Sequence, residues 1–369
     1  MSICHSVQAL VTRRRALALL AAGAGGATLA AACSGPAAPT AATTAPVPNP
    51  QPTAPVAAGQ PTAVPAVKSF GQASQVMNWF AQPSQGGFFT ATKLDQYKKL
   101  GLDMTTEQGG PGVSTIPLVA SGKYTFGMSG ADAILLARAE GIPVVALFAP
   151  YQTNPQGFMY HTESGIKDFG DLNGHKVYVA SAGAYYWDYI KAKYKLDQSE
   201  VLAYNGQLAT WLTDKGNVTQ CFVISEPYFA RKAGANPGTL LNAKSGYNPY
   251  QNMMFTSEQV IKEKPDVVRA YVQGCQQGWN SYLNDPAARQ ATFEFIKTYN
   301  KDQIDDAMQN EYQNSIELIM AGDTKTLGLG AMTEASWQTL HGQLKEINVL
   351  KKDVDVKTAF DVSYLTKAG

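Results

Sequence analysis

The residues of this chain that could do chemistry are mainly aromatic, and they follow short apolar runs. Trp79 and Phe88 follow one run, whereas Tyr185, Tyr186 and Trp187 follow another. Stacking on an aromatic side chain stabilises a bound base-like ring by about 1–3 kcal/mol, although any one of these side chains could instead be core. A helix turns by about 100° per residue, so three consecutive aromatic side chains cannot all face one core. We therefore expect at least one of the three to face a cleft or solvent, and we favour Tyr186 or Trp187 as a stacking partner opposite Trp79.

Glu226 and Tyr228 follow a third apolar run, "VTQCFVIS". Glu226 is the one carboxylate that we expect near a cleft, where it could accept N–H bonds from an aminopyrimidine or a ring imide. Its charge could equally complement the positive end of the helix that it begins. The loops "GGPGVS" and "SAGA" precede predicted helices, whose free backbone N–H groups could bind carbonyl or anionic oxygens. Glycine turns are common before helices, so these loops add only a weak signal.

The sequence offers no pattern typical of catalysis or metal binding. His161, His175 and His341 are isolated from one another, and neither a Ser-His-Asp arrangement nor an "HxxxH" or "CxxC" pattern occurs. Cys221 and Cys275 lie in apolar surroundings, which favours two buried free thiols over a disulfide. We therefore expect a protein that is not an enzyme and that needs neither a metal nor a cofactor.

The elements that must position these residues begin near residue 68. From there, short apolar runs alternate with segments of helical periodicity, and a long helical stretch follows from Ser257 to about Tyr299. Such alternation predicts parallel, doubly wound α/β sheets with helices on both faces. The chain of 369 residues is long enough for two such lobes. Ligands of these sheets bind beyond the carboxyl ends of the strands, which is where the aromatic residues are expected.

The N-terminal part of the sequence predicts export and anchoring. Residues 1–33 combine Arg13-Arg14-Arg15, an apolar stretch and "LAAAC", which is typical of a lipoprotein signal whose Cys33 becomes lipidated. Either the general or the twin-arginine export route is compatible with this signal. Residues 34–67 are rich in Pro, Ala and Thr and carry no charge, so they predict a linker. Without the signal, 27 Lys and Arg face 29 Asp and Glu, a net charge of −2 that gives no support to nucleic-acid binding.

Several segments of the chain resemble one protein family. The segments "NWFAQPSQGGFFTA", "DLNGHKVYV", "ISEPYFARKAGANP" and "EKPDVVRAYVQGCQQGWNSYLNDP" belong to a match over most of residues 73–290. They are similar to solute-binding proteins of bacterial ABC importers, in the NMT-type branch shared with thiamine-pyrimidine, sulfonate and nitrate binders. The resemblance implies a type II periplasmic-binding-protein fold, with two lobes joined by two crossover strands. Lobe 1 would comprise residues 68–151 and 252–369, and lobe 2 residues 152–251.

The resemblance also implies partners and further site residues. Cleft residues of the family come from strand ends and helix starts, which here include Gln82, Ser129 and Ser181. The protein would be a monomer, lipid-anchored on the extracytoplasmic side of the cell membrane, that works with an ABC permease and an ATPase. Relatives that synthesise thiamine pyrimidine have a cysteine-rich motif where this chain has "YNPYQ", which argues against synthase activity.

The choice of ligand depends on the charges near the predicted cleft. After the signal, arginines occur only inside predicted helices, at Arg138, Arg231, Arg269 and Arg289, which argues against a small sulfonate or nitrate ligand. The aromatic residues favour a flat, uncharged ring system. The chain also resembles the riboflavin-binding components of bacterial riboflavin importers, so we expect riboflavin. A formylaminopyrimidine precursor of thiamine is the alternative, because its small ring would make greater use of Glu226.

Overall fold

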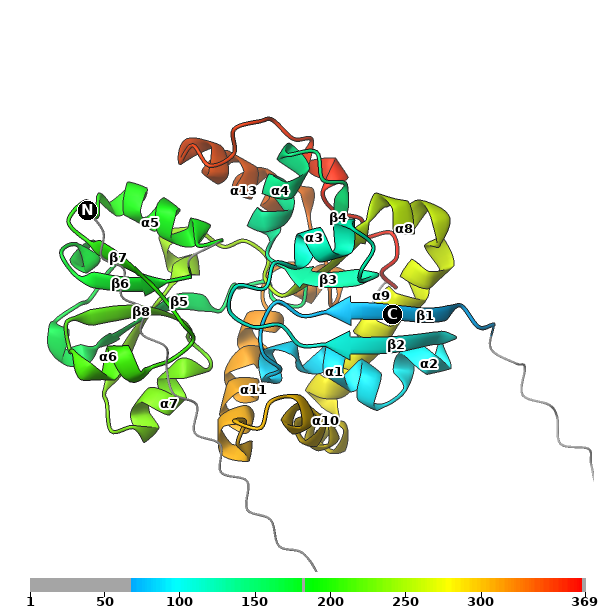
Figure 1. Cartoon of the computed structure of the whole chain (residues 1–369), viewed down its shortest axis with the longest axis horizontal. Coiled ribbons are helices and arrows are strands. Elements are labelled where there is room, and N and C mark those ends of the chain that lie inside the picture. The colour runs from blue at the N-terminus through cyan, green and yellow to red at the C-terminus, as the bar shows by residue number, and fades with distance from the viewer. Residues whose placement is uncertain (1–67, 181–182, 367–369) are drawn as a thin grey trace, which may run out of the picture. The chain divides into compact units, whose positions relative to one another are not determined.

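The computed structural model describes residues 68–180 and 183–366. The predicted signal, the linker, Cys33 and Ser181 lie outside the described residues. No helix among the described residues is both long enough and apolar enough to cross a membrane. The described part contains two five-stranded sheets, each surrounded by helices (Figure 1).

The first sheet has the strand order β2-β1-β3-β10-β4 and combines two separate parts of the chain. Its strands are β1 (Gly71–Val76), β2 (Leu102–Glu107), β3 (Phe126–Ser129), β4 (Val144–Phe148) and β10 (Met253–Ser257). The helices that precede β4 are η1 (Pro83–Gln85), α1 (Gly86–Lys93), α2 (Gln96–Lys99), α3 (Thr115–Ala120) and α4 (Ala131–Ala139). Those that follow β10 are α8 (Glu258–Glu263), α9 (Pro265–Asn284), α10 (Pro286–Tyr299), α11 (Asp305–Ile319), α12 (Thr324–Leu327), α13 (Glu334–Glu346) and η5 (Val356–Thr358).

The second sheet has the order β7-β6-β8-β5-β9 and is built from one continuous stretch of chain. Its strands are β5 (Gln156–His161), β6 (Lys176–Val179), β7 (Glu200–Ala203), β8 (Asn217–Phe222) and β9 (Pro237–Leu241). Its helices are η2 (Thr162–Ser164), η3 (Gly170–Leu172), α5 (Tyr185–Tyr194), α6 (Ala209–Thr213), α7 (Glu226–Lys232) and η4 (Asn242–Ser245). The prediction of a two-lobed α/β fold is confirmed by these two sheets.

One strand of each sheet departs from the predicted parallel arrangement. β10 runs antiparallel to β3 and β4, and β5 runs antiparallel to β8 and β9. Each is the first strand that the chain forms after it crosses from one sheet to the other. The parallel strands end at the side where the crossing occurs, so a strand that starts there must run in the opposite direction. The two crossing segments meet at an isolated antiparallel bridge between Tyr151 and Gln251.

Both faces of the first sheet are buried, which holds the segment after β1 in place. On β10, Met254 packs into the cluster that contains α1 and α9, whereas the next residue, Phe255, packs into the cluster that contains α4 and α13. Helices α1 and α9 approach closely because glycine occupies the contact: a Cβ atom on Gly278 would lie 2.2 Å from the carbonyl oxygen of Gly87. This close packing anchors α1, and with it the loop that leads from β1.

Candidate ligand-binding site

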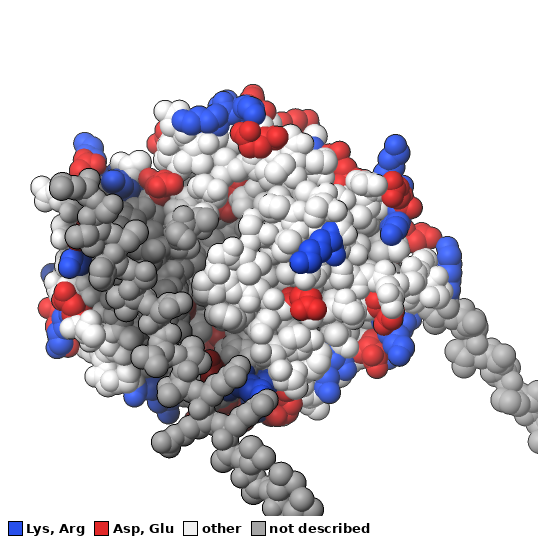
Figure 2. Space-filling model, viewed as in Figure 1, with Lys and Arg blue, Asp and Glu red and all other residues white. Residues whose placement is uncertain are grey.

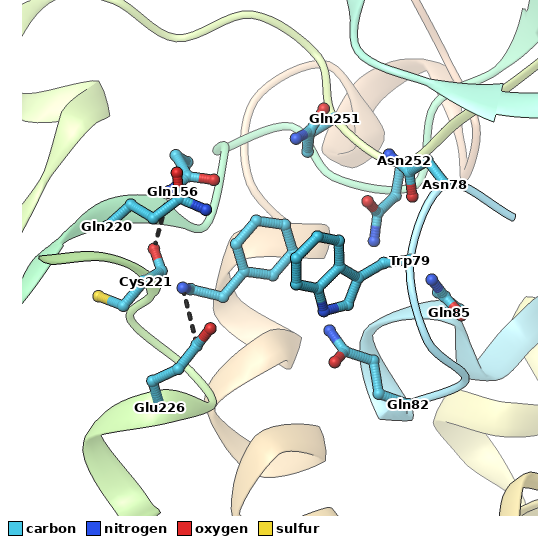
Figure 3. A pocket seen from close by; sticks show the side chains of 11 residues that line it. Asn78, Trp79, Gln82, Gln85, Gln156, Gln220, Cys221, Glu226, Gln251 and Asn252 are labelled. Carbon is cyan, nitrogen blue, oxygen red and sulfur yellow. Dashed lines mark hydrogen bonds between the residues drawn. The ribbon is translucent and has the colours of Figure 1, made fainter. Parts of the chain in front are cut away.

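A cavity lies where strands β1 and β8 end and where the second crossing segment passes. The space between its side chains, including the part open to solvent, is about 520 Å³. Figure 3 shows the side chains that surround it. The lining residues are Asn78, Trp79, Gln82, Gln85, Gln156, Gln220, Cys221, Phe222, Glu226, Gln251 and Asn252.

The two aromatic side chains of the cavity come from different sheets. Trp79 lies three residues beyond the end of β1, and Phe222 is the last residue of β8. Trp79 is partly exposed, and its ring makes an edge contact with Phe80 at a centroid distance of 5.8 Å. The face of the Trp79 ring is therefore not covered by stacking on Phe80. A flat ring bound between Trp79 and Phe222 would contact one aromatic side chain of each sheet.

Carboxamides make up most of the remaining lining: among the described residues, seven Asn and Gln side chains line the cavity, and no Lys or Arg does. Asn252 has a left-handed backbone with φ 53°, a conformation that Asn tolerates better than most residues. Its Nδ2 donates to the carbonyl oxygen of Ser84 at 3.1 Å, so its Oδ1 is available as an acceptor. Asn78 Oδ1 and Gln85 Oε1 are buried and have no hydrogen-bond partner among the described residues. A ligand with N–H or O–H donors would remove the cost of leaving these oxygens unpaired.

One carboxylate lines the cavity and a second lies behind it. Glu226 is the first residue of α7 and accepts the N–H of Phe222 at 2.9 Å, and burial raises its pKa to about 7. Glu311 on α11 is 3% exposed and accepts the N–H of Ser84 at 2.7 Å. Its pKa is also about 7, raised first by burial and then by the nearby charge of Glu226, while hydrogen bonds from Ser84 and Ser225 partly oppose the rise. Glu226 thus lies both at the cavity and at the start of a helix.

The structure brings three of the predicted site residues together at this cavity, namely Trp79, Gln82 and Glu226. Ser129, the last residue of β3, and Tyr228 on α7 do not line it. The expectation that Phe88 faces the cleft is wrong. Its ring is fully buried between Phe148 and Trp279, because α1 packs this side against α9 and the sheet.

None of the three consecutive aromatic residues lines the cavity either. Tyr186 and Trp187 are 7% and 3% exposed, and both rings contact Phe158 on β5, so the expected stacking role is not met. Tyr185 is half-buried, and its pKa is raised by burial and then by the charge of Asp132. The helix separates the three side chains as expected, but the two on its inner side both pack into the core.

Sequence reasoning missed most of the lining residues, including Phe222 and the carboxamides of Gln156, Gln220, Gln251 and Asn252. A signal was present in "VTQCF", because a Gln inside an apolar strand run needs a polar partner or a ligand. Gln251 and Asn252 lie in the second crossing segment, which carries no such pattern. Among the described residues, no three His, Cys, Asp or Glu side chains are grouped closely enough to hold a metal ion. Cys221 and Cys275 are both free and buried, as predicted.

Comparison with known proteins identifies the family. Residues 82–289, more than half of the chain, match the family described as NMT1/THI5 like. The chain belongs to this family. The riboflavin-binding protein RibY of Chloroflexus aurantiacus is 26% identical to this NMT1/THI5-like chain over 245 residues, 64% of this chain and 68% of that protein.

Two solved structures show how widely the fold of this NMT1/THI5-like protein is used. The alkanesulfonate-binding protein SsuA from Xanthomonas axonopodis pv. citri, bound to MOPS, is 12% identical with a TM-score of 0.61, over 80% of this chain and 99% of that one. The desulfurization enzyme DSZB is 13% identical with a TM-score of 0.54, over 79% and 97%. At these identities the likeness shows the fold, which is that of periplasmic solute-binding proteins and which also occurs in an enzyme.

The charges of the NMT1/THI5-like chain are mixed on the face that Figure 2 shows. Lys and Arg side chains lie among Asp and Glu side chains over this face, without a large area of one sign. A nucleic acid needs a concentration of positive charge, and neither this face nor the cavity lining provides one.

Proposed function

We propose that this protein is the substrate-binding component of an ABC importer, and that it binds riboflavin in the cavity and delivers it to a permease driven by an ATPase. One observation carries the proposal: in the part of the chain that the structure describes, the cavity has an aromatic side chain on each of two walls, seven carboxamides and no cation. Such a lining suits a flat, uncharged ring with a hydroxylated chain. The riboflavin-binding relative RibY supports the same choice of ligand.

The energetics of this lining are compatible with tight binding. Micromolar affinity requires about −8 kcal/mol. Stacking on aromatic faces contributes about 1–3 kcal/mol per ring, and burial of apolar ring surface contributes about 25 cal/mol per Å². The ribityl hydroxyl groups would donate to amide oxygens such as those of Asn78 and Gln85, which have no partner among the described residues. No charged anchor is required.

A formylaminopyrimidine precursor of thiamine is the second candidate, and Glu226 is the observation that favours it. The carboxylate lines the cavity and could accept the amino N–H groups of such a ring. A small sulfonate or nitrate is less compatible, because none of the described Lys and Arg residues lines the cavity to balance its charge.

We also propose where the protein acts and how it is held there. It acts outside the cytoplasm as a monomer, anchored to the cell membrane by a lipid on Cys33, and it performs no catalysis. Cys33→Ser is expected to leave riboflavin binding unchanged and to move the protein from the membrane fraction to the soluble fraction. A variant that remains in the membrane fraction would contradict the lipid anchor.

Fluorescence titration tests the ligand directly. Riboflavin fluorescence is expected to be quenched when the purified protein is added, because a ring stacked on Trp79 has a route for electron transfer. A rise in the midpoint of thermal unfolding should accompany binding. The absence of both effects at tens of micromolar vitamin would exclude riboflavin. The same thermal assay with formylaminopyrimidine would then decide between the two candidates.

A further inference from the structure

Gln220 on β8 is held in one orientation by two donors. Its Oε1 accepts the backbone N–H of Ala180 at 2.5 Å and the hydroxyl of Tyr186 at 2.5 Å. A backbone N–H can only donate, so the amide oxygen must lie on this side. The Nε2 amino group is therefore left to donate toward the cavity, which Gln220 lines.

Gln156, the first residue of β5, is held in the opposite orientation. Its Nε2 donates to the carbonyl oxygen of Cys221 at 3.2 Å, and the carbonyl oxygen of Gly157 lies 3.5 Å away. A carbonyl can only accept, so the amino group must face the strands. The Oε1 of Gln156 is therefore the atom available to a ligand as an acceptor.

The antiparallel pairing of β5 and β8 places these two side chains on one wall of the cavity. Gln156 lies opposite Phe222, and Phe158 lies opposite Gln220. Side chains alternate between the faces of a sheet, so Gln156, Gln220 and Phe222 share one face. Diagonal neighbours of this kind are about 7–8 Å apart, within reach of two glutamine side chains. In Figure 3 both glutamines lie on the same side of the cavity, across from Trp79.

We propose that Gln156 and Gln220 form an acceptor–donor pair that recognises a ring N–H next to a ring carbonyl. Gln156 Oε1 accepts the N–H, and Gln220 Nε2 donates to the carbonyl. The ligand class is a heteroaromatic lactam or imide, and riboflavin carries such an edge on its pyrimidine ring. The inference rests on the proposed function for the identity of the ligand. Tyr186 acts as a positioning residue, because its hydroxyl holds the oxygen of Gln220 away from the ligand.

A riboflavin analogue methylated on the imide nitrogen tests the pair, since it lacks the N–H but keeps the ring. With the purified full-length protein, its dissociation constant is expected to exceed that of riboflavin at least about fivefold, because Gln156 Oε1 loses its donor. Gln156→Leu should weaken riboflavin binding and reduce the discrimination between the two flavins to less than about twofold. If this variant does not fold, Gln156→Met provides the same test.

Two tyrosine variants test the positioning role. Tyr186→Phe leaves the ring in the core but removes one of the two donors to Gln220 Oε1, so the amide is held less firmly and riboflavin affinity should fall about two- to tenfold. Discrimination against the methylated flavin should persist in this variant, because Gln156 is unchanged. Tyr185→Phe is the matched control, since it removes a neighbouring hydroxyl that does not contact Gln220, and affinity should remain as in the wild type.

The possible results separate this inference from the proposed function. A wild-type protein that binds both flavins equally would overturn the acceptor–donor pair and leave riboflavin binding standing. A protein that binds neither flavin would overturn both. Undiminished discrimination in a folded Gln156→Leu variant would exclude Gln156 as the acceptor.

Discussion

Trp79 and Trp187 both follow a strand of a parallel array, yet they have different environments. Trp79 follows β1 in an irregular segment, is partly exposed and lines the cavity. Trp187 lies in the first turn of α5, is 3% exposed and packs against Phe158 on β5, a strand of the sheet that α5 covers. In this comparison, the aromatic residue that precedes the next helix lines the cavity. An aromatic residue inside the helix is directed by the helical turn, and the inner side of that helix covers the sheet.

The largest expected effect is on stability and concerns Trp187. Trp187→Ala removes a large buried ring and should lower the free energy of unfolding by about 3–5 kcal/mol, as measured by chemical denaturation. The folded fraction should bind riboflavin with unchanged affinity. Trp187→Phe, which keeps most of the buried area, should cost less. A loss of affinity without a loss of stability would place Trp187 in the binding site after all.

Two glutamates differ in the same way as the two tryptophans. Glu226 lines the cavity, whereas Glu311 lies behind it. Burial raises the pKa of Glu311 to about 7 from an ordinary 4.5. At a pH between these two pKa values, Glu311 keeps its proton in the folded protein but has released it in the unfolded chain. The free energy of unfolding therefore falls as the pH rises. Glu226, with a pKa of about 7, and Asp132, with a pKa of about 6, act in the same direction.

In the variant Glu311→Gln, the free energy of unfolding should therefore decrease less with rising pH than in the wild type. The difference between the two decreases should be at most about 3 kcal/mol between about pH 5 and pH 8. Denaturation curves measured across this range check the difference. Glu317→Gln is the matched control, because Glu317 is exposed on the same helix and the substitution should leave the pH profile unchanged. Identical profiles for wild type and Glu311→Gln would contradict the role of the buried carboxyl group.

Trp79→Ala should show the reverse of the Trp187 result. Loss of one stacking face is expected to cost about 1–3 kcal/mol of binding, a rise of about 5- to 150-fold in the dissociation constant of riboflavin. Stability should change by less than about 1 kcal/mol, because the ring is partly exposed. Trp79→Phe keeps an aromatic face and should retain more of the affinity in the same titration. Equal affinities for wild type and Trp79→Ala would remove Trp79 from the site.

Tyr185→Phe should have the smallest effect. Its hydroxyl is half-buried and takes part in none of the hydrogen bonds described above, so unfolding free energy should change by less than about 0.5 kcal/mol. Riboflavin affinity should also stay constant. A loss of riboflavin affinity greater than about threefold would indicate that Tyr185 contacts the ligand, and Tyr185 would then belong with Trp79 rather than with Trp187.

Much of the fold was predictable because apolar runs and helical periodicity are local properties. The two sets of strands and helices, the helical stretch after Ser257 and the free thiols of Cys221 and Cys275 follow from such patterns. The antiparallel direction of β5 and β10 was not predictable in this way. Strand direction depends on the side from which the chain enters a sheet, and that is a property of the whole path.

The site was predictable only in part for the same reason. Trp79 and Glu226 could be identified because each follows an apolar run directly. Phe88 was misplaced because its burial depends on the close approach of α1 and α9, which are far apart in the sequence. Phe222 was missed because it belongs to a strand run that reads as core. Only its position at the cleft end of β8 makes it a cavity residue.

By itself, the sequence determined the alternation of strands and helices, the absence of a catalytic pattern and the family to which the chain belongs. These properties reside in residue types and their spacing. The tertiary structure decided which aromatic rings line the cavity and which way each glutamine amide points. Those choices depend on contacts between distant segments, such as the hydroxyl of Tyr186 on Gln220 and the carbonyl of Cys221 on Gln156. Such contacts exist only once the two sheets have formed, because each strand supplies just one of the partners.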